Sequence, residues 1–316
     1  MDEYKIPVIS VAGPTASGKT KLAVALAQKY SGEVISCDSM QIYKDLSIST
    51  AKPSSEEMQG VPHHLIDFLS VEESFSVADY CDEAKKCISE VTGRGKNVIL
   101  CGGTGLYLQS LLENIDFSGN KSDAAVREKL RLRAENEGCE SLWNELLSTD
   151  PETARELHPN NVGRVIRALE LYYTSGITMS EQKKQSKKNP SPYNPCIICI
   201  DYKDRQKLYD RINLRVDLML SEGLEAEARA FFERTKNSDG TARQAIGCKE
   251  FIPYFEGRIT FDEAVEAIKK ETRHYAKRQL TWFNRMENVN KLYADGLSFE
   301  EIEQEAVRMI ESSGIF

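Results

Sequence analysis

The stretch Gly13-Pro14-Thr15-Ala16-Ser17-Gly18-Lys19-Thr20 decides the fold, because it fits the phosphate-binding pattern G-x-x-x-x-G-K-[ST] at every fixed position. An apolar run at 8–12 precedes it and predicts a strand, and residues 21–27 after it predict a helix. In this context successive backbone N–H groups and a helix N-terminus surround an anion. Lys19 adds a full positive charge, so we predict that a di- or triphosphate binds here. The alternative, a chance glycine-rich turn, does not explain the flanking strand and helix.

Two further apolar runs predict strands of the same sheet. Residues 33–37 lead into Asp38, and residues 97–101 lead into Gly102-Gly103-Thr104, with a predicted helix at 77–91 between them. Alternation of strands and helices is typical of a parallel sheet covered on both faces. Ligands of such sheets bind beyond the carboxyl ends of the strands. We therefore expect Lys19, Asp38 and Thr104 to lie close together.

The middle of the chain has a different pattern. Helices are predicted at 123–137 and at 161–174, the second ending at Gly176, and a lysine-rich loop at 186–195. A strand near Ile197 is then followed by predicted helices at 205–221, at 225–235 and within 261–286. The expected fold is α/β, a phosphate-loop NTPase-like parallel-sheet core (1–117 and 196–316) with a helical insertion domain (118–195).

Composition limits the function classes. The 316 residues are 41% hydrophobic and 28% charged, which is ordinary for a globular enzyme of about two domains. The polar start, residues 1–5, does not resemble a signal peptide, and no apolar run is long enough to cross a bilayer, so we expect a cytoplasmic protein without a membrane partner. The net charge of −8 argues against general nucleic-acid binding, although local basic faces remain possible at 183–188 and 269–285.

Cysteine and histidine spacing does not indicate a metal site. Of eight cysteines only Cys196 and Cys199 have zinc-like spacing, and no second pair completes four ligands, so we expect no structural zinc. His63 and His64 are adjacent and cannot share a helix face. A turn with hydrogen-bonded imidazoles is the preferred interpretation.

Asp38 is the acidic residue expected at a strand end. A kinase or hydrolase usually places a magnesium-binding carboxylate near the phosphate loop, and the strand at 97–101 offers none at its end. Asp38 beside a diphosphate is suited to accept a proton from a nucleophile, with Ser39 and Gln41 as hydrogen-bonding neighbours. A helix N-cap or a magnesium ligand are the alternatives.

Two basic groups have two interpretations each. Arg205 and Arg211 are suited to phosphate oxygens, but ion pairs with Asp204, Asp210 or Asp217 would explain them as well. In the segment 269–285, basic side chains alternate with Tyr275, Trp282 and Phe283. This pattern fits an RNA backbone with unstacked bases, and equally a solvated helix with a buried aromatic stripe.

Together these pieces resemble the tRNA dimethylallyltransferase family, also called tRNA isopentenyltransferases. The resemblance covers nearly the whole chain, and the order and spacing of its motifs make it specific. The motifs are GPTASGKT at 13–20, SCDSMQIY at 36–43, STAKPS at 49–54, HHLIDF at 63–68, GGTGLYL at 102–108, HPNNVGRVIRALE at 158–170, AIGCKE at 245–250 and TRHYAKRQLTWF at 272–283.

The resemblance implies a reaction and its partners. The family transfers a dimethylallyl group from its diphosphate to the exocyclic N6 amine of the adenosine 3′-adjacent to the anticodon, in tRNAs that read codons beginning with U. The partners implied are dimethylallyl diphosphate and the tRNA anticodon stem-loop, with Mg²⁺ as cofactor. We expect a monomer.

The resemblance also implies site residues. Asp38 would be the general base, with Thr20 and Arg211 as further catalytic residues and Thr20 as a magnesium ligand. The diphosphate would be held by Gly13, Thr15, Ala16, Ser17, Gly18, Lys19, Thr20, Arg205 and Arg211. The tRNA would be contacted by Asp38, Ser39, Met40, Gln41, Thr104, Arg127, Asn161, Val162, Gly163, Arg164, Val165, Lys277 and Arg278, with the stretch 242–249 nearby.

One departure and three alternatives accompany this prediction. Cys248 stands where the family commonly has Tyr, so a contact made by that side chain is not expected here. The sequence also ends near Phe316 without the zinc finger of eukaryotic relatives, which favours the bacterial form. The alternatives are an isopentenyltransferase acting on free AMP, ADP or ATP, a phosphate-loop small-molecule kinase, and an RNA-binding protein that uses the loop as a nucleotide switch.

Overall fold

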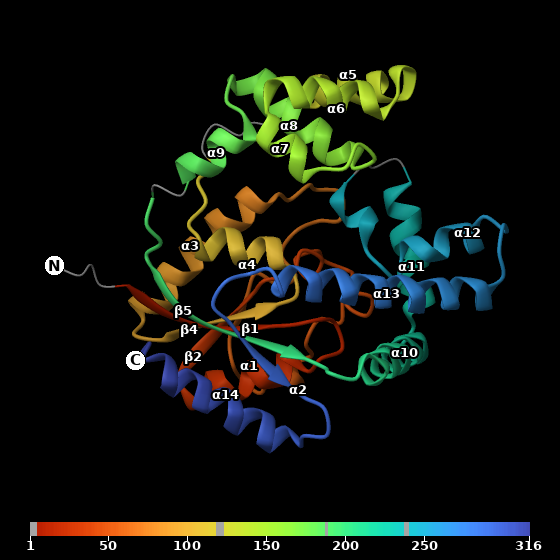
Figure 1. The fold of residues 1–316 in the computed structure, drawn as a ribbon. Helices are drawn as coiled ribbons and strands as arrows, with labels where there is room; N and C mark the ends of the chain where they lie inside the picture. The colour runs from red at the N-terminus through yellow and green to blue at the C-terminus, as the bar shows by residue number, and fades with distance from the viewer. Residues whose placement is uncertain (1–4, 118–122, 187–188, 237–239) are drawn as a thin grey trace. The chain divides into compact units, whose positions relative to one another are not determined.

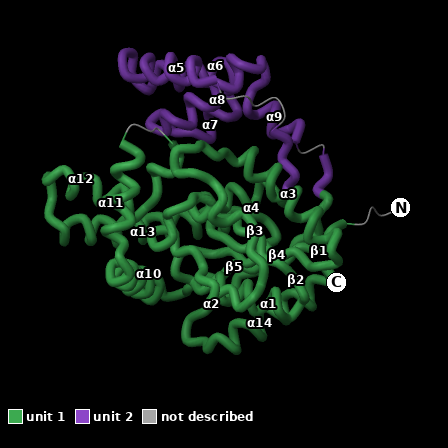
Figure 2. The backbone as a smooth tube through the Cα atoms, turned by 180° about the vertical axis from the view of Figure 1, so that it is seen from behind, with its two compact units in different colours: residues 1–112, 192–316 green, residues 113–191 purple. Residues whose placement is uncertain are grey.

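The fold is known from a computed structural model, which describes residues 5–117, 123–186, 189–236 and 240–316. The chain divides into two compact units, one of residues 1–112 and 192–316 and the other of residues 113–191 (Figure 2). The sequence-based boundaries were 117/118 and 195/196. Residue 118, most of the N-terminal pentapeptide, and Lys187 and Lys188 of the basic stretch lie outside the described residues.

The first unit is built on a six-stranded sheet with the strand order β3-β2-β4-β1-β5-β6. Every neighbouring pair is parallel, which confirms the predicted α/β class. The strands are β1 (Ile6–Ala12), β2 (Gly32–Ser36), β3 (His63–His64), β4 (Asn97–Gly102), β5 (Tyr193–Asp201) and β6 (Val289–Tyr293).

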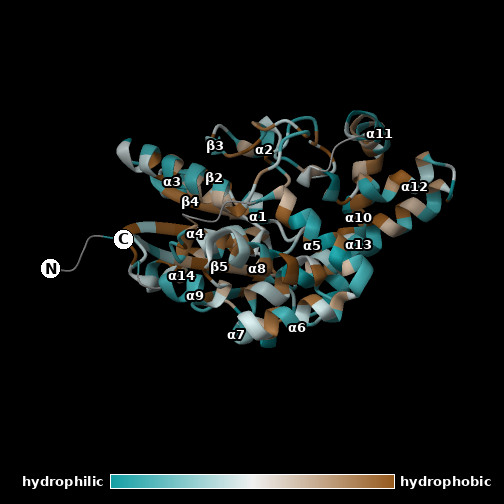
Figure 3. Ribbon diagram, turned by 90° about the horizontal axis from the view of Figure 1, so that it is seen from above, coloured by the Kyte–Doolittle hydropathy of each residue, from teal (hydrophilic) through white to brown (hydrophobic). Residues whose placement is uncertain are grey.

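Helices cover both faces of this sheet. In Figure 1, α1 (Lys19–Lys29) and α14 (Phe299–Ser313) lie on one side, and α3 (Val77–Gly93), α4 (Gly105–Leu112) and α13 (Phe261–Phe283) lie on the other. Figure 3 shows hydrophobic residues along the strands, and the central strands are buried on both faces, as expected for a parallel sheet. One core cluster joins Leu22 and Leu26 of α1 to Ile198 of β5 and Ile310 of α14.

A second cluster supports the carboxyl-end edge of the sheet. Leu46, Leu224, Phe231 and Phe251 are among its buried residues, which join the segment after β2 to α11 and α13. The remaining helices of this unit are α2 (Ser55–Met58), α10 (Arg205–Ser221), α11 (Leu224–Thr235), α12 (Ile252–Phe255) and the 3₁₀ helices η1 (Thr241–Gln244) and η2 (Lys249–Phe251).

The edges of the sheet differ from the sequence prediction. His63 and His64 form a short strand beside Val34 and Ile35 rather than a turn, although both imidazoles are hydrogen-bonded, to the Val61 carbonyl (2.9 Å) and to Glu33 (2.7 Å). The strand β6 was missed because three of its five residues are exposed, which removes the apolar signal of a buried strand.

The predicted loop at 186–195 is wrong at its C-terminal end. Tyr193 to Pro195 belong to β5 and pair with β1, where Val8 stands opposite Pro195. Pro is tolerated here because β6 begins to pair with β5 only at Ile197, so this part of β5 has a strand on one side alone among the described residues.

The second unit is helical, with a core of its own. Its helices are α5 (Ala124–Glu137), α6 (Cys139–Thr149), α7 (Pro151–Glu156), α8 (Val162–Ser175) and α9 (Met179–Ser186). Leu130, Leu142, Leu146 and Leu169 pack in its interior. α8 ends at Gly176, which takes the left-handed conformation (φ 72°) that favours glycine. Among the described residues, no helix is long and apolar enough to span a bilayer.

Candidate active site

The phosphate loop connects β1 to α1 with the backbone geometry that an anion site needs. Gly13 (φ 142°) lies so close to β5 that a Cβ there would stand 2.6 Å from the Ile200 carbonyl oxygen. Ala16 (φ 61°) and Gly18 (φ 90°) also take positive φ values, and Gly18 caps the N-terminus of α1. Alternation of backbone conformations of this kind turns successive N–H groups toward one concavity.

Two side chains of the loop are suited to donate to an anion. The ammonium of Lys19 folds back onto the Pro14 carbonyl oxygen at 2.7 Å. The pKa of Lys19 is lowered from 10.5 to about 8, chiefly by burial and also by the nearby Arg215, against opposing contributions that include Asp38. The buried Ser17 hydroxyl finds no hydrogen-bond partner among the described residues. A bound diphosphate would accept hydrogen bonds from both groups and raise the pKa of Lys19, which favours its charged form.

A cavity of about 880 Å³ opens beside the loop. Thr15 to Thr20 line one side, and Asp38 to Gln41 line another, so the phosphate loop and the predicted base face the same space. Residues 47–53, Arg211, Arg215 and residues 244–247 complete much of the wall. A cavity of this size holds a five-carbon diphosphate together with a purine base.

The segment after β2 is held by its own side chains. Asp38 Oδ1 accepts the backbone N–H groups of Met40 (2.9 Å) and Gln41 (3.3 Å), which is the cap-like role considered as an alternative. The Ser39 N–H donates to Thr104 Oγ1 at 3.1 Å, which confirms that the ends of β2 and β4 meet. Capping uses one oxygen of Asp38, and the residue still lines the cavity.

The two predicted arginines lie in different places. Arg211 lines the cavity, and its Nε donates to the Ala16 carbonyl oxygen of the phosphate loop at 2.9 Å. Arg205 is not among the lining residues and pairs with the buried Asp201 at 2.5 Å. The ion-pair interpretation thus fits Arg205, with a partner that was not foreseen, and the phosphate interpretation fits Arg211.

The helix α13 brings two further polar groups to the cavity. Gln279 is 5% exposed and bridges two loops, since it accepts the Thr15 N–H (2.9 Å) and donates to the Gly103 carbonyl (3.0 Å). Tyr275 also lines the cavity, and burial together with the charge of Asp38 raises its pKa. Arg278 lines the cavity and stacks over Tyr275, whereas Lys277 is exposed and is not a lining residue.

Comparisons with known proteins agree with this geometry. The sequence pattern of the IPP transferase family matches residues 41–286. The chain belongs to the IPP transferase family. It is 48% identical over 288 residues to the tRNA dimethylallyltransferase of Bacillus subtilis (91% of each chain), and 43% identical over 307 residues to that of Thermoanaerobacter sp. (96% of this chain, 98% of the relative).

Solved structures of the family are similar over most of their length. The tRNA isopentenylpyrophosphate transferase of Bacillus halodurans superposes with a TM-score of 0.72 at 41% identity, covering 98% of both chains. A eukaryotic dimethylallyltransferase acting on tRNA superposes with a TM-score of 0.82 at 32% identity, covering 96% of this chain and 78% of that one.

Within the insertion, the structure positions the residues that the family resemblance singled out. Arg127 of α5 pairs with the fully buried Glu170 of α8 at 2.9 Å, and Arg167 pairs with the same carboxylate. Burial alone would raise the pKa of Glu170, but hydrogen bonds from Arg167, Arg127 and the Asp123 N–H lower it. Asn161 to Val165 form the first turn of α8, where Asn161, Gly163 and Arg164 are exposed.

Residues 244–249 form another wall of the cavity. Gly247 takes a positive φ (98°), a Cβ there would stand 3.4 Å from that of Ser49, and its N–H donates to Glu250 at 2.8 Å. Cys248 is 1% exposed, and burial raises its pKa to about 12. Its side chain is therefore turned into the protein, and no contact with a substrate is expected from it.

Magnesium is implied by the family resemblance, and few side chains near the cavity could bind it as ligands. Thr20 lines the cavity at the start of α1 and is the hydroxyl of the loop pattern. No group of three His, Cys, Asp or Glu residues gathers within the described parts of the chain. The residues present fit an ion that takes most of its ligands from a diphosphate and water, with Thr20 as its protein ligand.

Proposed function

We propose that this protein transfers the dimethylallyl group of dimethylallyl diphosphate to the N6 amine of the adenosine 3′-adjacent to the tRNA anticodon. The observation that carries the proposal is that Asp38 and the phosphate loop face one cavity. Membership of the IPP transferase family, whose relatives are named as tRNA enzymes, supports it. We further propose that it acts as a monomer in the cytoplasm.

The phosphate loop side of the cavity stabilises the leaving group. Carbon–oxygen cleavage leaves a delocalised allyl cation and places negative charge on the diphosphate oxygens. The Lys19 ammonium and the Arg211 guanidinium line the cavity beside the loop N–H groups, and Lys19 would exchange the Pro14 carbonyl for a diphosphate oxygen, so charge for the leaving group is already at hand. Bound Mg²⁺ would add neutralising charge to the diphosphate, held by Thr20.

The Asp38 side of the cavity aims the nucleophile. The adenine must leave its stack to reach an enclosed diphosphate. Its N6 nitrogen forms the new bond to carbon while the carbon–oxygen bond breaks, and one N6 proton passes to the Asp38 carboxylate. Since the amine becomes acidic only as the new bond forms, the base acts late in the step. Ser39 and Gln41 line the cavity beside Asp38, and Thr104 accepts the Ser39 N–H, so we propose that these three residues orient the adenine.

The tRNA backbone requires exposed positive groups besides those beside the phosphate loop. Arg278 and Lys277 on α13 are exposed, as are Arg127 and Arg164 in the insertion. The first turn of α8 adds a helix N-terminus suited to a phosphate. We propose that these residues hold the anticodon stem-loop by its phosphates despite the negative charge of the whole chain.

The experiment is mass spectrometry of tRNA nucleosides after incubation of the purified protein with labelled dimethylallyl diphosphate. We expect one labelled, prenylated adenosine per substrate tRNA and no transfer to AMP in a parallel reaction. Transfer to AMP without transfer to tRNA would contradict the proposal, and so would ATP-dependent phosphorylation of a metabolite without prenyl transfer. Light scattering of the same sample tests the monomer.

A further inference from the structure

The segment Ser47–Lys52 forms a compact turn in the wall of the cavity. The Ala51 N–H donates to the Ile48 carbonyl (2.9 Å) and the Lys52 N–H to the Ser47 carbonyl (3.0 Å), which closes the turn on itself. All of its residues line the cavity. We call this segment the wall turn. It has no secondary structure that would hold it in place, so its position depends on contacts made by other elements.

Glu227 of α11 makes the most concentrated of these contacts. Its Oε2 accepts the N–H groups of Ser47 and Ile48, and its Oε1 accepts that of Ser49, each at 2.8 Å. Three successive N–H groups directed at one carboxylate form an anion nest, and hydrogen bonds to an ionised acceptor are about twice as strong as neutral ones. The sequence separation is 178 to 180 residues, so no local motif announces the contact.

The other side of the wall turn is connected to the base. Gln41 Nε2 donates to the carbonyls of Thr50 (3.2 Å) and Ala51 (3.1 Å). The Gln41 N–H donates to Asp38 Oδ1 at 3.3 Å, and Gln41 Oε1 accepts the Ser36 hydroxyl at 3.2 Å. A continuous path of hydrogen bonds therefore runs from Glu227 through the wall turn and Gln41 to Asp38.

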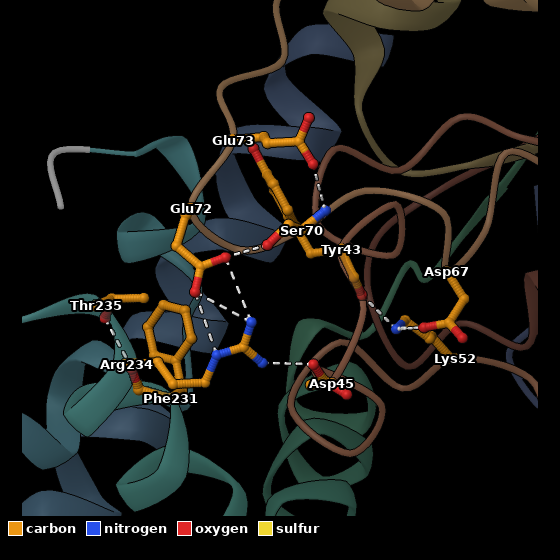
Figure 4. Close-up of polar contacts among 10 residues, drawn as sticks. All are labelled: Tyr43, Asp45, Lys52, Asp67, Ser70, Glu72, Glu73, Phe231, Arg234 and Thr235. Atoms are coloured by element: carbon orange, nitrogen blue, oxygen red, sulfur yellow. Dashed lines mark hydrogen bonds and ion pairs between the residues drawn. The ribbon is translucent and has the colours of Figure 1, made fainter.

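Separate contacts anchor the ends of this region, so the chain does not rely on Glu227 to fold. Two turns further along α11, Arg234 lies between Asp45 (2.6 Å) and Glu72 (3.1 Å), and Lys52 reaches Asp67 and the Tyr43 carbonyl (Figure 4). Leu46 is buried against α11 residues immediately before the wall turn. Loss of Glu227 would thus loosen the middle of the turn and leave its ends attached.

We infer that Glu227 is a positioning residue of the prenyl-transfer site: by holding the N–H groups of residues 47–49 it keeps Gln41 and Asp38 aligned for the incoming adenine. The inference rests on the proposed function for its kinetic consequence. It does not involve the phosphate loop, which is held by Gln279 and Arg211. The expected signature is therefore a loss of kcat with little change in KM for the diphosphate substrate.

The test compares Glu227→Ala, Glu227→Gln and Glu227→Asp with the unmodified protein. Glu225→Gln is the matched control, because that carboxylate lies on the same helix but pairs with Arg229 of α11 (3.0 Å). Hydrogen–deuterium exchange of peptides covering residues 47–49, thermal unfolding, and steady-state kinetics with dimethylallyl diphosphate and tRNA are measured on each.

For Glu227→Ala we expect exchange of these amides at least about tenfold faster and kcat about tenfold lower, with the diphosphate KM within about twofold. Glu227→Gln retains one acceptor oxygen, so its exchange rate and kcat should lie between those of Glu227→Ala and the unmodified protein. Glu227→Asp should recover part of the lost kcat. Unchanged exchange in both Glu227→Ala and Glu227→Gln, or a loss confined to the diphosphate KM, would overturn the inference. If the unmodified protein transfers no prenyl group, the proposed function fails, while the exchange measurement still tests the contact.

Discussion

The two sides of the cavity are held in place in different ways. The donor wall, residues 13–20, runs from the end of β1 into the first turn of α1, and under the proposed function its backbone N–H groups would bind the diphosphate. The acceptor wall, residues 38–52, is irregular and is held by Glu227 of α11, by Thr104 and by its own side chains. Charge for the leaving group thus comes from a rigid local motif, and orientation of the nucleophile comes from an assembly of distant residues.

The largest effect is expected at the acceptor wall. Asp38→Ala should lower kcat by about 100-fold or more, the usual scale for loss of a general base, while tRNA still binds. Asp38→Asn keeps an oxygen for the Met40 and Gln41 N–H groups but cannot take the proton. Single-turnover kinetics with tRNA in excess measure the rate of both variants. A near-normal rate in Asp38→Asn would refute the role of Asp38 as general base.

At the donor wall, Arg211→Ala should lower kcat/KM for dimethylallyl diphosphate by about 30-fold, because a charge-assisted contact to the diphosphate is lost. Arg205→Lys is the matched control, since it keeps a cation opposite Asp201 and lies on the same helix away from the lining residues. We expect that control to stay within about threefold. The measurement is steady-state kinetics with dimethylallyl diphosphate as the varied substrate. Equal losses of kcat/KM in the two variants would mean that Arg205 also contacts the diphosphate.

The donor wall should also respond to pH through Lys19. Its pKa of about 8 in the free protein means that the ammonium loses its proton as pH rises through 8, whereas a bound diphosphate raises that pKa and favours the charged form. Donor binding is thus strongest below pH 8 and should weaken about tenfold between pH 7 and pH 9.

Titration calorimetry in two buffers of different ionisation heat should show proton uptake on donor binding near pH 8.5. Lys19→Arg stays charged across this range and should abolish the uptake. Proton release, or uptake of equal size in the arginine variant, would mean that another group titrates.

The same contrast explains how much of the molecule could be predicted from its sequence. The donor wall and the strands β1, β2 and β4 have local signals, a fixed-spacing motif and apolar runs, and they were predicted to within one or two residues. The edge strands β3 and β6 were missed because they are short or exposed. A strand with one neighbour does not need the continuous apolar pattern of a central one.

The side chains from distant helices that hold or line the two walls carry a weaker signal. Gln279 and Glu227 were not foreseen, because a helical pattern does not state which loop faces a given side chain. Arg215 also lines the cavity, and burial lowers its pKa. Its spacing of four from Arg211 could have indicated one helix face, whereas Arg205 and Arg211, six apart, do not share one.

The smallest effect on turnover is expected where the two walls are joined. Gln279→Ala removes the bridge between the Thr15 N–H and the Gly103 carbonyl, and should lower the free energy of unfolding by about 1–3 kcal/mol because both groups lose their partner. With donor bound, the diphosphate can accept from Thr15 instead, so the donor KM should rise only about threefold.

Thr281→Ala is the control, since its hydroxyl bonds within α13 to the Lys277 carbonyl (2.9 Å). Chemical denaturation with and without donor measures the effect. If donor restores most of the lost stability of Gln279→Ala, the bridge serves mainly to hold the empty loop open for the diphosphate. A loss of turnover beyond about tenfold would instead show that the donor wall depends on α13 during the reaction, and the two walls would then not be independent.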